Sequence, residues 1–117
     1  MHIYCLIDSH DFEDEVAPHL GPIETAINDW LTESRSSAIL YKDIEGKKPF
    51  IGLLIETNRK LTLKKPIECL YVLSQKYTLE CVIGLLKNDD RDDVCYFGAE
   101  EGEPDINEIA NYLGLDK

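Results

Sequence analysis

The apolar run from Leu79 to Leu86 limits the fold of this chain more than any other stretch. It is apolar apart from Glu80 and is bounded by polar residues. A short run of this kind between turn signals is typical of a buried strand. Turn-type residues follow at 88–93, and the β-branched and aromatic residues 94–97 predict a last strand that pairs back. We therefore expect a sheet in which Leu79–Leu86 is a central strand.

The rest of the chain alternates between strand-like and helix-like spacing. Further strands are predicted at 2–7, 38–44 and 49–56, the last two forming a hairpin. Helices are predicted from Gly21 to the serines at 34–37, from Pro66 after a basic loop at 58–65, and from residue 104 to Gly114. The order β-α-β-β-α-β-β-α predicts an α+β fold, with a single, mainly antiparallel sheet of about five strands and helices packed on it. The length of 117 residues fits a single domain spanning residues 1–117.

Charge is distributed unevenly along the chain. The net charge is −11, yet residues 34–87 hold ten basic and five acidic side chains. Residues 1–33 hold eight acids and no Lys or Arg, and residues 88–117 hold ten acids against two basic residues. This layout favours basic protein partners, and it disfavours nucleic acid and anionic membrane surfaces as partners.

Neither a membrane span nor an export signal is expected. The apolar stretches are far shorter than the roughly 20 residues that cross a bilayer. The N-terminal stretch MHIYCLIDSHDFEDE lacks a basic region. The four cysteines lie singly among apolar neighbours, without a C-x-x-C pair, which is typical of reduced core thiols in a reducing compartment. We therefore expect a cytoplasmic protein.

Acidic residues gather in three stretches, at 8–15, 89–93 and 100–105. Aromatic residues lie inside or beside these stretches, and aromatics ringed by carboxylates are expected where a basic protein docks. The first and third stretches would lie at one end of the sheet if the first and last strands run parallel. The predicted partner-binding residues are Asp8, Asp11, Phe12, Glu13, Asp14, Glu15, Asp89, Asp90, Asp92, Asp93, Tyr96, Glu100, Glu101 and Glu103.

The same residues give little support to metal binding or catalysis. A calcium loop that starts at Asp90 would place Cys95 where a glycine is needed and Val94 at the fifth ligand position. The phosphate-binding glycine motifs and the G-x-S-x-G elbow are absent from the sequence. The acids lie in solvent-type segments, where general acid and base pairs with separated pKa values are not expected. We expect no enzyme, no catalytic residue, no metal and no cofactor.

The leading hypothesis is a non-catalytic inhibitor, an immunity protein or antitoxin of a bacterial cell, whose acidic surface occludes the active site of a basic, nuclease-like toxin. Solubility alone is the simpler interpretation of the same acids. A second hypothesis is a small ligand-binding domain or enzyme with a pocket near Asp8, His10 and Tyr41. A third is a homo-oligomeric adaptor whose acidic and basic regions meet between chains.

The basic middle of the chain raises a separate possibility. Where two of its loops meet, lysines and arginines would form a patch for RNA or phosphate. The alternative is that these residues keep the hairpin ends soluble. The residues concerned are Lys47, Lys48, Arg59, Lys60, Lys64 and Lys65.

Overall fold

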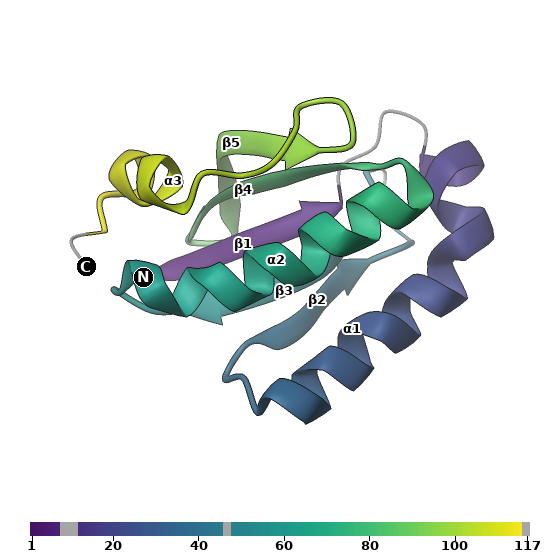
Figure 1. Ribbon diagram of the computed structural model, residues 1–117, viewed down its shortest axis with the longest axis horizontal. Helices are drawn as coiled ribbons and strands as arrows, with labels where there is room; N and C mark the ends of the chain where they lie inside the picture. The colour runs from purple at the N-terminus through teal and green to yellow at the C-terminus, as the bar shows by residue number, and fades with distance from the viewer. Residues whose placement is uncertain (8–11, 46–47, 116–117) are drawn as a thin grey trace.

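Figure 1 shows the computed structural model, which describes residues 1–7, 12–45 and 48–115. The strands are β1 His2–Ile7, β2 Ile39–Asp43, β3 Phe50–Glu56, β4 Glu80–Lys87 and β5 Asp90–Gly98. The helices are α1 Leu20–Ser34, α2 Lys60–Tyr77 and α3 Ile106–Leu113, and two short turns, η1 Phe12–Val16 and η2 Ala17–His19, precede α1. This order of elements confirms the α+β prediction.

The strands form one sheet in the order β2-β3-β1-β4-β5, and every pair of neighbours is antiparallel. The first four strands with α1 and α2 have the β-α-β-β-α-β order of the split βαβ arrangement. The Leu79–Leu86 run supplies β4, which lies inside the sheet, while β1 is the middle strand. Because β1 and β5 are both antiparallel to β4, they run in the same direction and end at the same end of the sheet.

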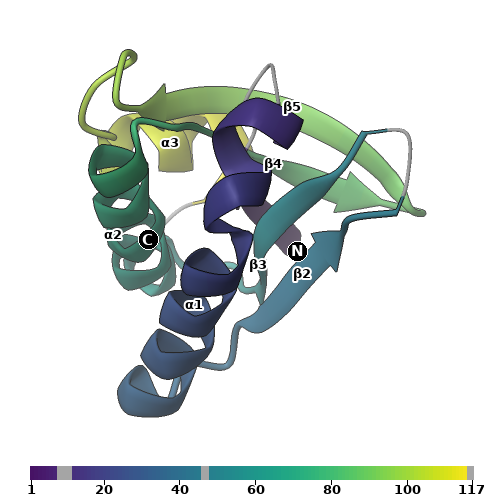
Figure 2. The ribbon, with the colours of Figure 1, turned by 90° about the vertical axis from the view of Figure 1, so that its right-hand side faces the viewer.

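All three helices cover the same face of the sheet (Figure 2). Alternate residues of β1 point towards them, and Ile3, Cys5 and Ile7 are fully buried there. α1 adds Ile23 and Ile27, one helical turn apart. α2 contributes its own buried face of Leu63, Ile67 and Leu70. Burial of each such aliphatic side chain contributes about 1.5–3 kcal/mol, so this layer supplies most of the folding free energy.

Within the described residues, no helix lies over the opposite face of the sheet (Figure 2), yet the middle of this face is also buried. Tyr4, Leu6 and Val82 form a second, smaller apolar cluster. Partly buried side chains of the flanking strands pack against them, namely Tyr41, Phe50, Leu54 and Leu86. β1 is therefore buried on both faces, which explains why its sequence is continuously apolar instead of alternating.

α2 begins at Lys60, so the prediction of a basic loop at 58–65 and of a helix that opens at Pro66 is wrong. Pro66 lies buried inside the helix, where it removes one backbone donor. The helix continues through this position because Leu63 and Ile67 lie one turn apart on the buried face. Val72 of this helix is 63% exposed.

The prediction that the turn spans residues 88–93 is wrong, because the turn is shorter. Only Asn88 and Asp89 form the turn, with φ of 50° and 69°, because a two-residue hairpin turn of type I′ needs positive φ at both positions. Lys87 pairs with Asp90, so the remaining aspartates belong to β5. Acids that were expected in a loop therefore lie on a strand.

α3 begins and ends where the sequence predicts. The Asp105 carboxylate accepts hydrogen bonds from the backbone N–H groups of Asn107, at 3.0 Å, and Glu108, at 3.2 Å, which is an N-cap. Gly114 ends the helix with a φ of 80°. Within the described residues, no helix is both long enough and apolar enough to span a bilayer.

Candidate functional site

The edge strand β5 connects two of the three predicted acidic stretches along one edge of the sheet. Its nine residues extend for about 30 Å at the usual rise of a strand. Asp89 and Asp90 lie at its beginning, and residues 99–105 follow its end. We use the name acidic edge for Tyr96 and the exposed acids on this strand and its flanks, which are Asp89, Asp90, Asp92, Glu100, Glu101 and Glu103. None of these acids forms an ion pair with another described residue.

The segment after β5 is held in place by backbone contacts, so its acidic side chains remain exposed. The Glu80 carboxylate accepts hydrogen bonds from the backbone N–H groups of Glu100, at 2.8 Å, and Glu101, at 3.2 Å. Gly98 and Gly102 pair through their backbones at 3.1 and 2.8 Å. Both glycines have positive φ, 144° and 94°, a conformation that other residues rarely adopt. Two glutamates are thereby fixed at the end of the strand.

Exposed aromatic residues accompany the acids. Tyr96 is 50% exposed in the middle of β5, and its hydroxyl donates to the Asp93 carboxylate over 3.5 Å. Tyr112 on α3 is 59% exposed and donates to Glu108 at 3.0 Å. The hydrogen bond to Glu108 raises the pKa of Tyr112. An exposed tyrosine among carboxylates is suited to bury its ring, and its hydroxyl, against a partner.

Asp93 differs from the other acids because its carboxylate is hydrogen-bonded to a buried side chain of the sheet. Its carboxylate accepts a hydrogen bond from the buried Tyr4 hydroxyl. The Arg91 guanidinium lies 5.8 Å from the Tyr4 ring centre and 4.8 Å from the Phe50 ring centre, within the range of cation–π attraction. Burial, and then the hydrogen bond to Asp93, raise the pKa of Tyr4. The Tyr4 hydroxyl therefore remains a donor at neutral pH.

Gly84 makes this arrangement possible. It faces Tyr4 across the β1–β4 pair, at a bulge in the β4–β5 pairing. A Cβ atom at this position would lie 2.7 Å from the Tyr4 Cζ atom and would also collide with the Asp92 carbonyl oxygen. The strand glycine therefore allows the Tyr4 ring to lie flat against β4, a typical use of glycine inside a strand. We use the name tyrosine cluster for Tyr4, Phe50, Gly84, Arg91 and Asp93.

The first acidic stretch is described only in part. Asp8 and Asp11, and the pocket proposed near Asp8 and His10, lie outside the described residues, and the Phe12 side chain is likewise not described. Glu13, Asp14 and Glu15 are exposed on η1. Ile7 in β1 and Phe97 in β5 both pair with Cys81 of β4, one from each side. β1 and β5 therefore end at the same end of the sheet. η1 follows β1 in the chain, and residues 99–105 follow β5. The turn at 88–89 lies at the opposite end.

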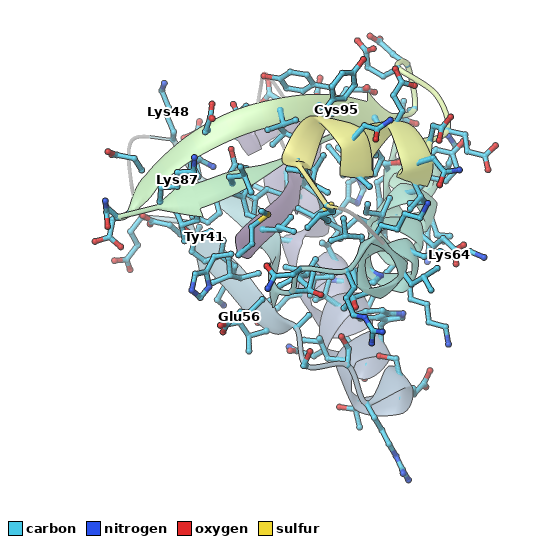
Figure 3. All side chains as sticks on the ribbon, turned by 90° about the vertical axis from the view of Figure 1, so that its left-hand side faces the viewer. Tyr41, Lys48, Glu56, Lys64, Lys87 and Cys95 are labelled. Carbon is cyan, nitrogen blue, oxygen red and sulfur yellow. The ribbon has the colours of Figure 1, made fainter. Side chains whose placement is uncertain are left out.

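The expected basic patch does not form, because its two loops lie at opposite ends of the sheet. Lys48 precedes Phe50, which pairs with Asp43 at one end of β3, whereas Arg59 follows Glu56 at the other end. The seven residues of β3 separate the two loops. Figure 3 also places Lys48 and Lys64 on different sides of the molecule. Lys47 lies outside the described residues.

The described residues offer little for metal or nucleophile chemistry. They hold no group of three or more His, Cys, Asp and Glu side chains that could bind a metal ion. None of the four cysteines forms a disulfide with another described residue. Burial raises the pKa of the thiols of Cys5 and Cys95, and raises that of Cys69 to about 11. Thiols with such pKa values are protonated at neutral pH and are poor nucleophiles.

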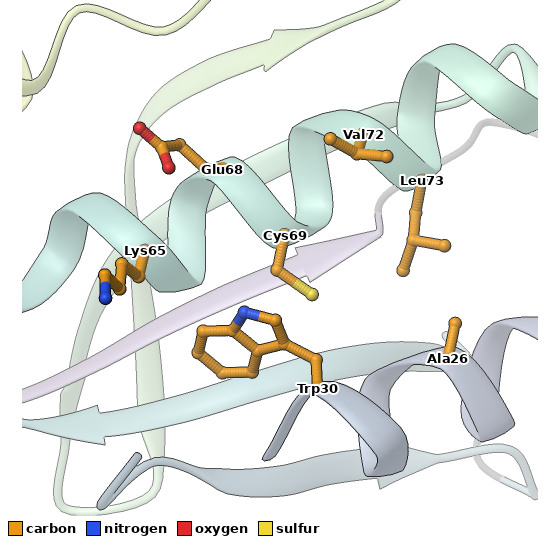
Figure 4. A pocket seen from close by; sticks show the side chains of 7 residues that line it. All are labelled: Ala26, Trp30, Lys65, Glu68, Cys69, Val72 and Leu73. Carbon is orange, nitrogen blue, oxygen red and sulfur yellow. The ribbon is translucent and has the colours of Figure 1, made fainter. Parts of the chain in front are cut away.

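A groove that the sequence analysis missed lies between α1 and α2. Its main cavity has a volume of about 420 Å³ and is lined by Ala26, Trp30, Lys65, Glu68, Cys69, Val72 and Leu73. A second cavity of about 220 Å³ shares Trp30 and Lys65 with it and adds Ser34, Ser36, Leu61, Thr62, Lys64 and Pro66. Figure 4 shows the Trp30 ring between the helices, with the Cys69 thiol directed towards it. We use the name α1–α2 groove for the two cavities together.

Tyr41, the third member of the predicted pocket, lies on the helix-free face of the sheet. Its ring is tilted against the Phe50 ring, with a distance of 4.8 Å between their centres. It is partly buried, and its contact with Phe50 places it beside the tyrosine cluster, although β2 and β5 are opposite edge strands of the sheet. Its role there is packing of the helix-free face.

Comparison of the chain with protein-family models, curated proteins and solved structures finds no match.

Proposed function

We propose that this protein is a non-catalytic acidic binding protein of the immunity-protein or antitoxin type, which neutralises a basic, nuclease-like toxin by covering its active site. The observation that carries this proposal is the acidic edge, where exposed acids that form no ion pair with another described residue lie on and beside the strand that carries the half-exposed Tyr96. Carboxylates spaced along the acidic edge resemble the row of phosphate charges on the nucleic acid that the active-site cleft of a nuclease binds. η1 extends the negative charge at one end of the sheet.

The electrostatics support fast, salt-sensitive association. A net charge of −11 attracts a basic partner over a distance of about one Debye length, roughly 8 Å at physiological salt. After contact, the half-exposed ring of Tyr96 can be buried against the partner, which adds apolar contact area that the surrounding carboxylates cannot supply. We infer that the protein acts in the cytoplasm, where its four cysteine thiols remain reduced.

The simpler account is that these acids protect a sheet edge from pairing with another sheet, as charged residues on edge strands do. The two accounts predict different results in a capture experiment. The tagged protein is incubated at low salt with lysate of its own source, and bound proteins are eluted with a salt step. Recovery of one basic protein at near-equal amount supports the proposal, whereas recovery of nothing above background supports edge protection.

Two variants that each lose three negative charges test which surface of this protein binds the captured protein. Asp92→Asn, Glu100→Gln and Glu101→Gln remove three charges from the acidic edge. Asp29→Asn, Glu33→Gln and Glu56→Gln remove three exposed charges elsewhere. We expect the edge variant to bind at least about ten-fold more slowly at low salt and the control variant to change less than about two-fold. Equal loss in both variants would mean that only net charge matters.

A further inference from the structure

The α1–α2 groove has the shape and lining of a small-molecule site. Its main cavity of about 420 Å³ falls within the range of roughly 300–1,000 Å³ that ligand pockets occupy. Ala26, Trp30, Val72 and Leu73 give it apolar walls from both helices. Val72 is 63% exposed, although burial of such a side chain would be favourable. An apolar occupant of the groove would cover it.

Cys69 belongs to the apolar lining of the groove. Its thiol is directed towards the Trp30 ring (Figure 4), and the protonated form is dominant at neutral pH because burial raises its pKa to about 11. Cys69 is partly buried, and a protonated thiol in such a position packs as a small apolar group. The floor of the groove is therefore uncharged.

Positive charge is placed at one end of the groove. Lys65 lines both cavities, and Lys64 lines the second cavity. Neither lysine forms an ion pair with another described residue. Hydroxyl groups of Ser34 and Thr62 line the same end. Glu68, one turn further along α2, places a negative charge beside the main cavity.

We propose that the α1–α2 groove binds a monomeric, single-chain amphipathic carboxylate of the medium-chain fatty acid type. Its chain lies along Trp30, Cys69 and Val72, and its carboxylate meets Lys64 and Lys65. Ala26, Val72 and Leu73 line the end of the main cavity away from Lys65 (Figure 4), so the alkyl chain and not the carboxylate lies there, which sets the direction of the ligand. This site is separate from the acidic edge and does not depend on the proposed inhibitor function.

Trp30 is the only tryptophan in the chain, so its fluorescence reports directly on the groove. The whole protein is titrated with decanoate below its micelle concentration at neutral pH. We expect a saturable blue shift of the emission, because the alkyl chain displaces water from the indole ring. Absence of a saturable shift in the folded protein would overturn the proposal.

Charge variants test the orientation of the ligand. The variant Lys64→Gln with Lys65→Gln should weaken decanoate binding about ten-fold, since two exposed charge interactions are lost. The matched control replaces Lys48 and Lys87, which lie away from α2 (Figure 3), by Gln and should leave affinity within about two-fold. Unchanged affinity in the groove variant would contradict the proposed carboxylate site.

Three further measurements separate this ligand from other occupants. Val72→Glu alters a largely exposed position, so the fold should persist while decanoate binding is lost. Decanol, with a similar chain but no charge, should bind more weakly than decanoate. Binding to vesicles of anionic lipid without any response to monomeric decanoate would indicate a membrane-facing surface and overturn the proposal.

Discussion

Acidic residues have different consequences in the tyrosine cluster and on the acidic edge, although both regions include residues of β5. In the tyrosine cluster, Asp93 accepts a hydrogen bond from buried Tyr4 and lies beside Arg91. On the acidic edge, Asp92 is exposed and forms no ion pair with a described residue. Adjacent aspartates in the sequence therefore separate into one that supports the fold and one that is available to a partner.

The largest effect is expected from adding a methyl group to the tyrosine cluster. Gly84→Ala should destabilise the fold by about 3 kcal/mol or more, because both the Tyr4 ring and a backbone carbonyl must move. Chemical denaturation measures this change. Gly21→Ala in α1 is the matched control, since nothing lies within 4 Å of the added carbon. It should be neutral or slightly stabilising, and equal destabilisation by both variants would contradict the assigned role of Gly84.

Removal of the carboxylate acceptor should have the next largest effect on stability. Asp93→Ala leaves the buried Tyr4 hydroxyl without its partner, at a cost of about 1–3 kcal/mol. Asp92→Ala should change the free energy of unfolding by less than about 0.5 kcal/mol, as surface substitutions usually do. A double-mutant cycle of Asp93→Ala with Tyr4→Phe measures the coupling directly. A coupling energy near zero would mean that Asp93 has no structural role.

Stability should fall at high pH because of Tyr4. Its pKa is raised in the folded protein, while an unfolded tyrosine has a pKa of about 10. The folded state therefore binds the proton more tightly, and this stabilisation is complete below pH about 10 and is lost progressively above it. Thermal melts at increasing pH should show the loss in the wild type. The variant Tyr4→Phe should show a smaller loss, and equal curves would contradict this assignment.

The smallest effect is expected at Arg91. Its guanidinium lies over Phe50 at 4.8 Å, and an exposed cation–π contact contributes about 0.5–1 kcal/mol. Arg91→Gln should destabilise the fold by no more than this amount in equilibrium unfolding. Since Arg91 is the only basic residue within β5, the same variant also makes the edge more negative. If Arg91→Gln slowed association with the basic partner, the electrostatic account of the acidic edge would be wrong.

Element types and order could be predicted because periodicity and turn residues are local. The Ile23 and Ile27 spacing, the Asp105 cap and the Gly114 stop all act within one helical turn. The start of α2 was missed because tertiary burial of Leu63 outweighs the local signals of a basic segment and Pro66. The extent of β5 was missed because Asn88 and Asp89 alone complete the turn.

The composition of the candidate site was partly predictable, but its arrangement was not. Charge clustering marks Asp92 and Glu101 as surface residues, yet only strand pairing shows that β5 joins their stretches. The role of Asp93 depends on a contact with Tyr4, which is 89 residues away in the sequence. The α1–α2 groove also depends on how two helices pack. For the tyrosine cluster, the sequence did offer one signal. Gly84 lies inside an apolar strand, and a glycine in that position indicates that another group approaches the backbone closely.

The central claim is that the acidic edge, and not net charge, binds a basic partner. The most direct test measures the association rate of the captured basic protein with the edge variant and with the charge-matched control at low and high salt. The account predicts slow association of the edge variant at low salt, near wild-type association of the control, and convergence of all three proteins at high salt. Equal rates for the two variants at low salt would contradict it.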